Sequence, residues 1–406
     1  MTPAVRRCDV VVIGGGSAGL AAALASARTG AATLLVERHG YLGGMGTAAL
    51  VHSFCGLYLL RTEPGAELAN PGIPAQIEER MIEATGIGPR RYGRVDVLPQ
   101  HPVEFARIAD NLCAAEKTLD LSFHSELTGV ERDADGWRLS IATRGGIQTT
   151  DAATLVDASG DAVVAGFLSI ETVMMQANLL QRPAYVFGVC RPRSAEDHDP
   201  LLTAGRIVEG VRSGEVPDEA LGLVFRASGR PWEMFGTIDL PGPADGGYDP
   251  LDPSCLGELE RVGRAVATAA VRWLARKDPS WADAYISHWP LRAGVRESRR
   301  WRGEATLTGD DLLQSRRFDD ETALATWPME FRENTRGPRL RFPHTDDPCG
   351  IPAGCLKPAG MDRLFVAGRC ISTDHDAQAS IRVMGTCFAT GEAAGTMAAA
   401  ASGGSA

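Results

Sequence analysis

The feature that most constrains this chain is a glycine-rich motif near its start, directly after a short apolar run. Residues 10–13 are Val, Val, Val and Ile, and such a β-branched run is typical of a buried parallel strand. Gly14, Gly16 and Gly19 follow with the spacing G-x-G-x-x-G. In this motif the glycines permit a tight turn, a close approach of the backbone to a pyrophosphate, and close packing of the next helix on the strand.

The residues after the glycines complete a strand–helix–strand unit. Residues 18–27 are rich in Ala and predict a helix, whose N-terminus offers free N–H groups to a phosphate. Residues 33–36 predict a second strand, which ends at Glu37. In dinucleotide sites an acidic residue at this position binds the ribose hydroxyls. Its negative charge argues against a 2′-phosphate on that ribose. Since all these parts occur in order, the segment predicts a dinucleotide-binding site rather than a glycine-rich turn without a ligand.

The length and composition of the chain indicate a soluble globular protein of two domains. A chain of 406 residues is too long for one small core. Its 44% apolar and 23% charged residues are ordinary values, and its net charge of −10 argues against nucleic acid as a partner. No apolar run approaches the roughly 18 residues of a membrane helix. Because no signal peptide precedes the first strand, we expect a cytoplasmic protein with no membrane partner.

The nine cysteines are scattered and odd in number, and they form no C-x-x-C motif. This pattern favours reduced, mostly buried thiols over a disulfide framework or a zinc site, and we predict no bound metal. Cys349 and Cys355 are the closest pair in sequence, and a redox disulfide between them is the alternative.

Hydrophobic periodicity predicts the elements that follow the first unit. Helices are expected over residues 77–85 and 101–117, with loops in the rest of the segment from 55 to 100. The strands of a β-meander are expected next, over residues 121–127, 137–143 and 147–150.

The character of the sequence changes over residues 172–285, where Pro and Gly are frequent and no dinucleotide motif recurs. We therefore expect a second domain there. Its predicted strands and helices cover residues 184–189, 201–212, 234–240 and 255–276.

Further motifs stand outside that region. A second glycine cluster, with Gly43 and Gly44, follows Glu37 and lets the backbone approach a ligand again. Residues 154–161 predict a buried strand that ends in a turn of small residues. Residues 294–304 read Gly-Val-Arg-Glu-Ser-Arg-Arg-Trp-Arg-Gly-Glu, and residues 363–372 predict a strand that ends in Ala-Gly-Arg-Cys-Ile-Ser.

Taken together, these motifs resemble those of FAD-dependent oxidoreductases, flavoproteins distantly related to fumarate reductase and succinate dehydrogenase. The resemblance implies an α/β fold, with a Rossmann-like FAD-binding domain that carries a β-meander insertion. It assigns residues 1–171 and 286–406 to this discontinuous domain, and residues 172–285 to a smaller α+β substrate or cap domain. We expect non-covalent FAD, because the residues around His52 do not match the motif that carries flavin covalently in fumarate reductase relatives.

The resemblance also implies which residues contact FAD: those of the glycine motifs, the turn after residue 157, the turn at residue 368 and the start of the last helix. They are Gly14, Gly16, Ser17, Ala18, Gly19, Glu37, Arg38, Gly43, Gly44, Met45, Thr47, Ala158, Ser159, Gly160, Asp161, Gly368, Arg369, Val383, Met384 and Gly385. One residue departs from the wider pattern. Arg369 stands where such flavoproteins usually have Asp, and its guanidinium could neutralise a phosphate instead.

Candidate catalytic residues come from the basic segment and from two histidines. Arg296 and Arg299 match the family motif, and a guanidinium there would bind a substrate carboxylate or the charge of reduced flavin, although surface ion pairing is the alternative. His52 and His375 are candidates for the base that takes a proton from the substrate. The other arginines of the segment are interpreted as surface charges paired with Glu297 and Glu304: they are Arg292, Arg300 and Arg302.

The leading hypothesis is an FAD-dependent oxidoreductase that oxidises a small organic molecule by hydride transfer to flavin N5, with O2 or another acceptor reoxidising the flavin. One alternative is a flavin monooxygenase that uses NAD(P)H, and another is a flavin-binding regulatory or structural protein without turnover. No second G-x-G-x-x-G is present, which disfavours a dedicated nicotinamide domain. The sequence leaves the oligomeric state open.

Overall fold

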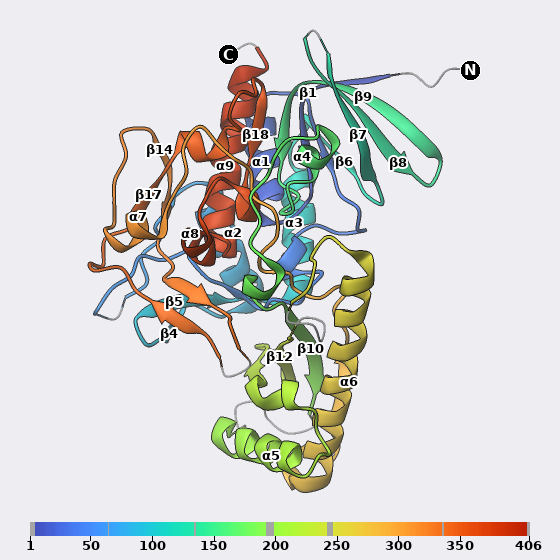
Figure 1. Ribbon diagram of the computed structural model, residues 1–406, viewed down its shortest axis with the longest axis vertical. Helices are drawn as coiled ribbons and strands as arrows, with labels where there is room; N and C mark the ends of the chain where they lie inside the picture. Colours follow the sequence, from blue (N-terminus) through green and yellow to red (C-terminus); the bar gives the residue numbers. More distant parts are fainter. Residues whose placement is uncertain are drawn as a thin grey trace.

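The structure is a computed structural model, and it describes residues 5–63, 65–133, 135–191, 199–241, 247–334 and 337–403. Within these ranges the protein is of mixed α/β class. A large body is built on a seven-stranded sheet and a smaller body on a four-stranded sheet (Figure 1). The first strand and the last helix both lie in the large body, near the top of Figure 1.

The glycine motif lies in the strand–helix–strand unit at the centre of the large sheet. Strand β1 pairs in parallel with β2, so that both strands end at the same edge of the sheet. Strand β6 extends the sheet beyond β2, again in parallel. The elements of this part are β1 (Arg6–Ile13), α1 (Ser17–Arg28), β2 (Thr33–Val36), α3 (Pro102–Ala114) and β6 (Leu119–Ser122).

The long strand β9 joins the parallel strands to a β-meander. Residues 150–157 of β9 pair in parallel with β1, residues 146–152 pair antiparallel with β8, and residues 155–157 pair in parallel with β18. Four strand ends are thereby brought to one edge: those of β1, β2, β9 and β18. The strands of this part are β7 (Glu126–Asp133), β8 (Gly136–Thr143), β9 (Gly146–Asp157) and β18 (Leu364–Val366).

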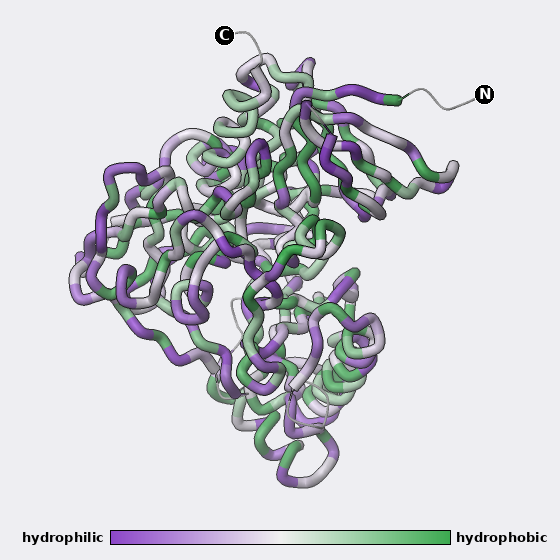
Figure 2. Tube along the Cα trace, turned by 45° about the horizontal axis from the view of Figure 1, so that its top comes forward, coloured by the Kyte–Doolittle hydropathy of each residue, from purple (hydrophilic) through white to green (hydrophobic). Residues whose placement is uncertain are grey.

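Helix α9 (Met384–Ala401) packs unusually close to α1, because small residues line their contact. A Cβ atom added at Gly395 would lie 2.1 Å from the carbonyl oxygen of Ala22, and one at Gly391 would lie 2.1 Å from that of Ala18. The glycines therefore let the two backbones approach each other. In Figure 2 the hydrophobic colours gather in the interior of this body and the hydrophilic colours on its outer loops.

The smaller body has a core of its own, between an antiparallel sheet and two helices. Alternate residues of β10 face opposite sides: Tyr185 and Phe187 belong to this core, whereas Ala184 and Val186 pack with Phe235 on the other side. The sheet order is β11-β12-β10-β13. The elements are β10 (Ala184–Cys190), α5 (Pro200–Arg212), β11 (Val224–Ala227), β12 (Glu233–Asp239), α6 (Pro253–Lys277) and β13 (Tyr285–His288).

The remaining elements surround the large sheet. They are β3 (Ser53–Phe54), α2 (Ile73–Thr85), β4 (Arg90–Tyr92), β5 (Val95–Pro99), α4 (Val163–Phe167), α7 (Gly309–Leu313), β14 (Glu321–Ala325), β15 (Met329–Phe331), β16 (Arg339–Arg341), β17 (Cys349–Pro352) and α8 (His375–Ile381).

Three predicted elements are wrong in their limits. The single strand expected over 121–127 is divided between β6 and β7, because His124 has a positive φ of 52° and turns the chain between them. The strands expected at 147–150 and from residue 154 are one continuous strand, β9. The segment from 55 to 100, expected to be mostly loop, contains most of a small sheet of β3, β5 and β4.

Candidate functional site

A cavity lies between the carboxyl ends of the parallel strands and the inner face of the four-stranded sheet. Ile13 and Val36 line it at the ends of β1 and β2, and Val186 and Thr237 line it from β10 and β12. In open α/β sheets, ligands bind outside the carboxyl ends of the strands. The cavity is thus the candidate site.

Most of the predicted cofactor residues line this cavity. They are Gly14, Gly16, Ser17, Ala18, Glu37, Arg38, Gly44, Met45, Ala158, Ser159, Gly160, Asp161, Gly368, Arg369, Val383 and Met384. The others lie behind the lining and support it: Gly19, Gly43, Thr47 and Gly385.

The glycine turn has the geometry that a close ligand requires. Gly14 has a φ of +96°, which residues with a side chain rarely adopt. A Cβ atom on Gly19 would lie 1.7 Å from the carbonyl oxygen of Gly14, so this glycine lets α1 start tightly against the turn. The hydroxyl of Ser17, the first residue of α1, is buried without a hydrogen-bond partner in the described part of the chain. A ligand with acceptor oxygens would satisfy it.

Glu37 joins the first glycine turn to the residues after β2. Its Oε2 accepts a hydrogen bond of 2.6 Å from the backbone N–H of Gly15, and its Oε1 accepts one of 2.8 Å from that of His39. Gly43 donates its N–H to the carbonyl of Gly15 at 2.8 Å, so the two glycine clusters lie against each other.

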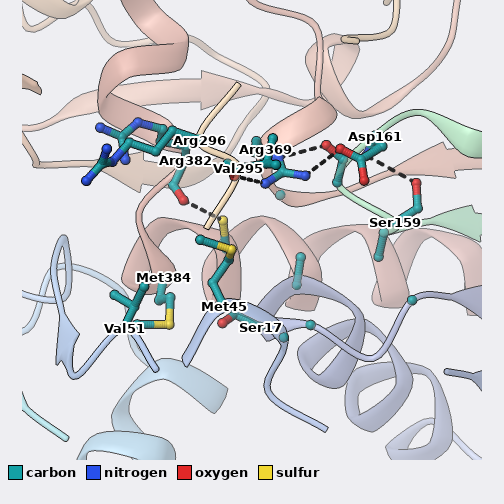
Figure 3. A pocket seen from close by; sticks show the side chains of 18 of the residues that line it. Ser17, Met45, Val51, Ser159, Asp161, Val295, Arg296, Arg369, Arg382 and Met384 are labelled. Carbon is teal, nitrogen blue, oxygen red and sulfur yellow. Dashed lines mark hydrogen bonds and ion pairs between the residues drawn. The ribbon is translucent and has the colours of Figure 1, made fainter. Parts of the chain in front are cut away.

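The turn after β9 is held by an ion pair between Asp161 and Arg369 (Figure 3). The Oδ1 of Asp161 accepts from Nη2 of Arg369 and from the hydroxyl of Ser298, both at 2.6 Å. Burial alone would raise the pKa of Asp161, but the guanidinium of Arg369 and the Ser298 hydroxyl hold it below its usual range. Arg369 also donates to the carbonyls of Gly160 and Val295, so its donors are largely used within the protein.

The start of α9 reaches the cavity as the motif predicted. Val383 is the N-cap residue, and both Val383 and Met384 line the cavity. Gly385 faces the opposite way: its N–H bonds to the carbonyl of Cys55 at 2.9 Å, and an added Cβ would lie 2.4 Å from the backbone of Gly56. Gly385 therefore allows the loop after β3 to pack against the helix start.

An arginine cluster occupies the end of the cavity nearest to the smaller body. Arg296 and Arg332 share the buried carboxylate of Asp239, with distances of 2.7 Å to Oδ1 and 2.8 Å to Oδ2. Burial would raise the pKa of Asp239, but the two guanidinium groups lower it. Arg332 also bonds to Glu330, at 2.7 Å. Figure 3 shows Arg296 beside Arg382, with Asp161 at the far end.

Arg382 has no carboxylate of its own within ion-pair distance among the described residues. It donates to the carbonyl of Glu330 at 3.1 Å and to the side chain of Gln181 at 3.4 Å, and its Nε is buried without a partner. Burial lowers the pKa of Arg382 to about 10, and the nearby Arg296 and Arg332 contribute to the shift. The cluster therefore carries more positive than negative charge.

His52 is the candidate base that lines the cavity. Its ring stacks on Phe235 with 5.0 Å between the centroids, and its Nδ1 lies 3.3 Å from the carbonyl oxygen of Leu50. This geometry assigns the proton to Nδ1. Burial lowers the pKa of His52 to about 3, so the ring is neutral near pH 7.

His375 and Arg299 do not line this cavity. The Nδ1 of His375 lies 2.9 Å from Oε1 of Glu297, and this hydrogen bond raises the pKa of the histidine. Arg299 donates its Nε to the carbonyl of Asp161 at 3.0 Å and thus supports the turn after β9 from behind.

Of the other three arginines, two are not surface charges, although the expected pairing with Glu297 is confirmed for Arg300. Arg300 is 1% exposed and pairs with the fully buried Glu297 at 2.6 Å. Arg292 lines the cavity. Only Arg302 is an exposed surface arginine among them, and it pairs with Glu171 rather than with Glu304.

Membrane-spanning helices, metal sites and disulfides were sought among the described residues. None of the helices described combines the length and apolar character needed to cross a membrane. Within the same residues, potential metal ligands do not gather in groups of three or more. All nine cysteines are free thiols, so Cys349 and Cys355 are not joined in this structure.

The family model described as FAD dependent oxidoreductase matches residues 9–405. The chain belongs to this family. FAD is therefore its cofactor, and non-covalent binding is typical of such proteins. The resemblance inferred from the motifs is confirmed.

Several solved structures have a partly similar chain trace. A geranylgeranyl bacteriochlorophyll reductase-like protein from Thermoplasma acidophilum has a TM-score of 0.47 and 12% identity, over 98% of this chain and 78% of that chain. The p-nitrophenol 4-monooxygenase of Pseudomonas putida has a TM-score of 0.45 and 12% identity, over 74% and 70%. The flavin-dependent monooxygenase PieE, solved with FAD and substrate, has a TM-score of 0.39 and 21% identity, over 74% and 51%. At these identities the similarity concerns the fold alone.

The cavity fits FAD by the chemistry of its lining. Several polar atoms beside it, among them the hydroxyl of Ser17 and the Nε of Arg292, are buried without partners in the described structure. Such atoms are costly unless a ligand satisfies them. Glycine backbone at Gly14 and Gly16 leaves room beside the start of α1, where phosphate groups bind in dinucleotide sites.

Sequence reasoning missed the arginines that come from outside the motifs. Arg382 directly precedes the motif residue Val383, and this position was a usable signal. Arg332 follows β15 and Arg226 belongs to β11, and neither segment has a pattern that distinguishes it from an ordinary strand. Only the folded topology brings these side chains to one cavity.

Proposed function

We propose that this FAD-dependent oxidoreductase oxidises a small organic molecule that carries an anionic group. When bound, FAD would accept a hydride at N5, and O2 or another acceptor would reoxidise it. The observation that carries the proposal is the arginine cluster of Arg296, Arg332 and Arg382, which faces the same cavity as the start of α9.

The charge balance of this cluster supports an anionic substrate. Asp239 and Glu330 neutralise Arg296 and Arg332. Burial would raise the pKa of Glu330, but the positive charges of Arg332 and Arg382 lower it to about 2. Arg382 and the more exposed Arg226 have no carboxylate at ion-pair distance within the described residues. A substrate carboxylate would supply the missing negative charge, and an arginine can hold it through two hydrogen bonds.

We propose that Arg296 contacts the substrate and that the neutral ring of His52 accepts a proton from it. Arg299 and His375, which do not line the cavity, would act through their neighbours: Arg299 by holding the turn at Asp161, and His375 through Glu297. The start of α9 would stabilise negative charge on reduced flavin through its N–H groups. The cytoplasmic location remains part of the proposal.

Anaerobic bleaching of the flavin tests the function. The holoprotein is mixed without oxygen with a panel of small carboxylic acids and with neutral analogues in which each carboxylate is replaced by an amide. We expect at least one acid to bleach the flavin absorbance, its amide to react far more slowly, and air to restore the colour. No bleaching by any organic substrate would contradict the proposal.

The same experiment with added NADH or NADPH separates the two alternatives. Substrate-stimulated oxidation of NAD(P)H in air, with no anaerobic bleaching by the substrate alone, would instead indicate a monooxygenase. A flavin that remains oxidised under all these conditions would favour a regulatory or structural flavin-binding protein.

A further inference from the structure

Arg292 lies on the segment that leads from the smaller body back to the large sheet. Leu291 and Arg292 both direct their backbone N–H groups to the carbonyl oxygen of Ala48, at 2.8 and 3.3 Å. This contact holds the segment against the loop of the second glycine cluster. The side chain of Arg292 lines the cavity, and its Nη2 lies 3.8 Å from the sulfur of Met45, which follows Gly43 and Gly44 of the second glycine cluster.

The charge of Arg292 is unpaired within the described structure. Its Nε is buried without a hydrogen-bond partner, and its Nη2 lies 3.8 Å from the sulfur of Met45. Burial lowers the pKa of Arg292 to about 10, and the positive charges of Arg38 and Arg369 outweigh the opposite effect of the Asp161 and Glu37 carboxylates, which lie beyond ion-pair distance. A cation whose buried Nε lacks a partner and which has no anion at ion-pair distance is costly, which indicates that a negatively charged ligand belongs beside it.

The position of Arg292 identifies which part of a ligand would be negative. Its charged neighbours include Arg38 and Asp161, which belong to the nucleotide-binding motifs rather than to the arginine cluster near the smaller body. Arg369 is already committed to Asp161 and to two carbonyl groups, so it has little donor capacity left for a phosphate. The anion expected beside the first glycine turn of a dinucleotide site is the pyrophosphate.

We propose that Arg292 binds the pyrophosphate of FAD. The segment between the two bodies thus supplies a counter-charge that the glycine motif itself lacks. The proposal concerns the cofactor and goes beyond the proposed reaction, because it holds whatever the substrate is.

Ligand affinities of the apoprotein test this assignment. Arg292→Gln removes the charge, and FAD and ADP should bind about ten- to a hundredfold more weakly, the amount expected for a charge-assisted hydrogen bond. Adenosine, which has no phosphate, should bind wild type and variant equally. Arg302→Gln is the matched control, because Arg302 is an exposed arginine of the same segment, paired with Glu171 on the surface.

Thermal unfolding of the apoprotein distinguishes a phosphate ligand from a structural role. Removal of an unpaired buried charge should leave the melting temperature of the Arg292→Gln apoprotein unchanged or raise it, while the stabilisation by added FAD becomes smaller. Unchanged FAD affinity would overturn the proposal. An equal loss of ADP and adenosine affinity would also overturn it. The same holds if Arg292→Gln lowers the melting temperature of the apoprotein by as much as that of the holoprotein.

Discussion

At the scale of single residues, the side chains that distinguish between possible functions are the charged ones that are buried. Arg296 is such a residue, 8% exposed and bound both to Asp239 and to the carbonyl of Arg182 at 2.5 Å. Its planar guanidinium can make these bonds and still present a donor edge to a substrate. A lysine at the same position would keep the positive charge, but it could not donate hydrogen bonds from two separate edges as the guanidinium does.

Arg296→Lys should therefore slow substrate turnover about ten- to a hundredfold and leave the flavin absorbance spectrum intact. The expected loss corresponds to one charge-assisted hydrogen bond of roughly 1.5–3 kcal/mol in the transition state. Steady-state kinetics on the substrate found by flavin bleaching measures it, with Arg302→Lys as the surface control. Turnover at the wild-type rate would show that Arg296 has only a structural role.

Glu330 gives a second prediction, about stability and pH. Its folded pKa of about 2 lies below the ordinary value of 4.5, so its ion pairs stabilise the protein above pH 4.5, and this contribution is lost as the pH falls toward 2. In Glu330→Gln this dependence is absent. The difference in unfolding free energy between wild type and variant, from urea titrations, should shrink between about pH 6 and pH 3.5. A constant difference over that range would contradict the assignment.

At the scale of elements, the contact between α1 and α9 depends on glycine. Gly395→Val would place a side chain where the carbonyl of Ala22 lies, and the two helices must then separate. The expected cost is about 1–3 kcal/mol of unfolding free energy, as for other overpacked cores. Thr396→Val on the exposed side of the same helix should change the stability by less than about 0.5 kcal/mol. Equal effects of the two variants in urea titrations would show that the close contact is not needed.

The elements that the sequence predicts well are those whose signals are local. The first strand, the glycine turn and the start of α9 are set by neighbouring residues, and they occur where the motifs place them. The break at His124 was not predictable from alternation, because the hydrophobic pattern continues while the pairing partner changes from β2 to β8. Periodicity reports which face of a strand is buried, and it does not report the partner strand.

At the scale of the whole molecule, the same distinction separates the two ends of the cavity. The end beside the first glycine turn is lined by motif residues, which the sequence singles out. The end with the arginine cluster is not predictable in this way, because Arg226, Arg332 and Arg382 come from segments far apart in the chain and meet only through the tertiary fold. A buried arginine also cannot be distinguished from a surface arginine in the sequence, because the sequence does not show which charges are paired.

Because the cavity is lined by both bodies, FAD should stabilise both of them. Val186 and Thr237 lie opposite each other on β10 and β12 and face the cavity from the smaller body, while Gly14 and Ser17 face it from the large body. Addition of FAD to the apoprotein should therefore slow amide hydrogen exchange in β10 and β12 as well as at the start of α1. At an FAD concentration of about a hundred times Kd, the free energy of unfolding should rise by roughly 2.7 kcal/mol. Exchange is measured by mass spectrometry on peptides from these elements, with β7 and β8, which lie in the meander, as the comparison. If protection is confined to the large body, FAD does not stabilise the smaller body, and the prediction fails.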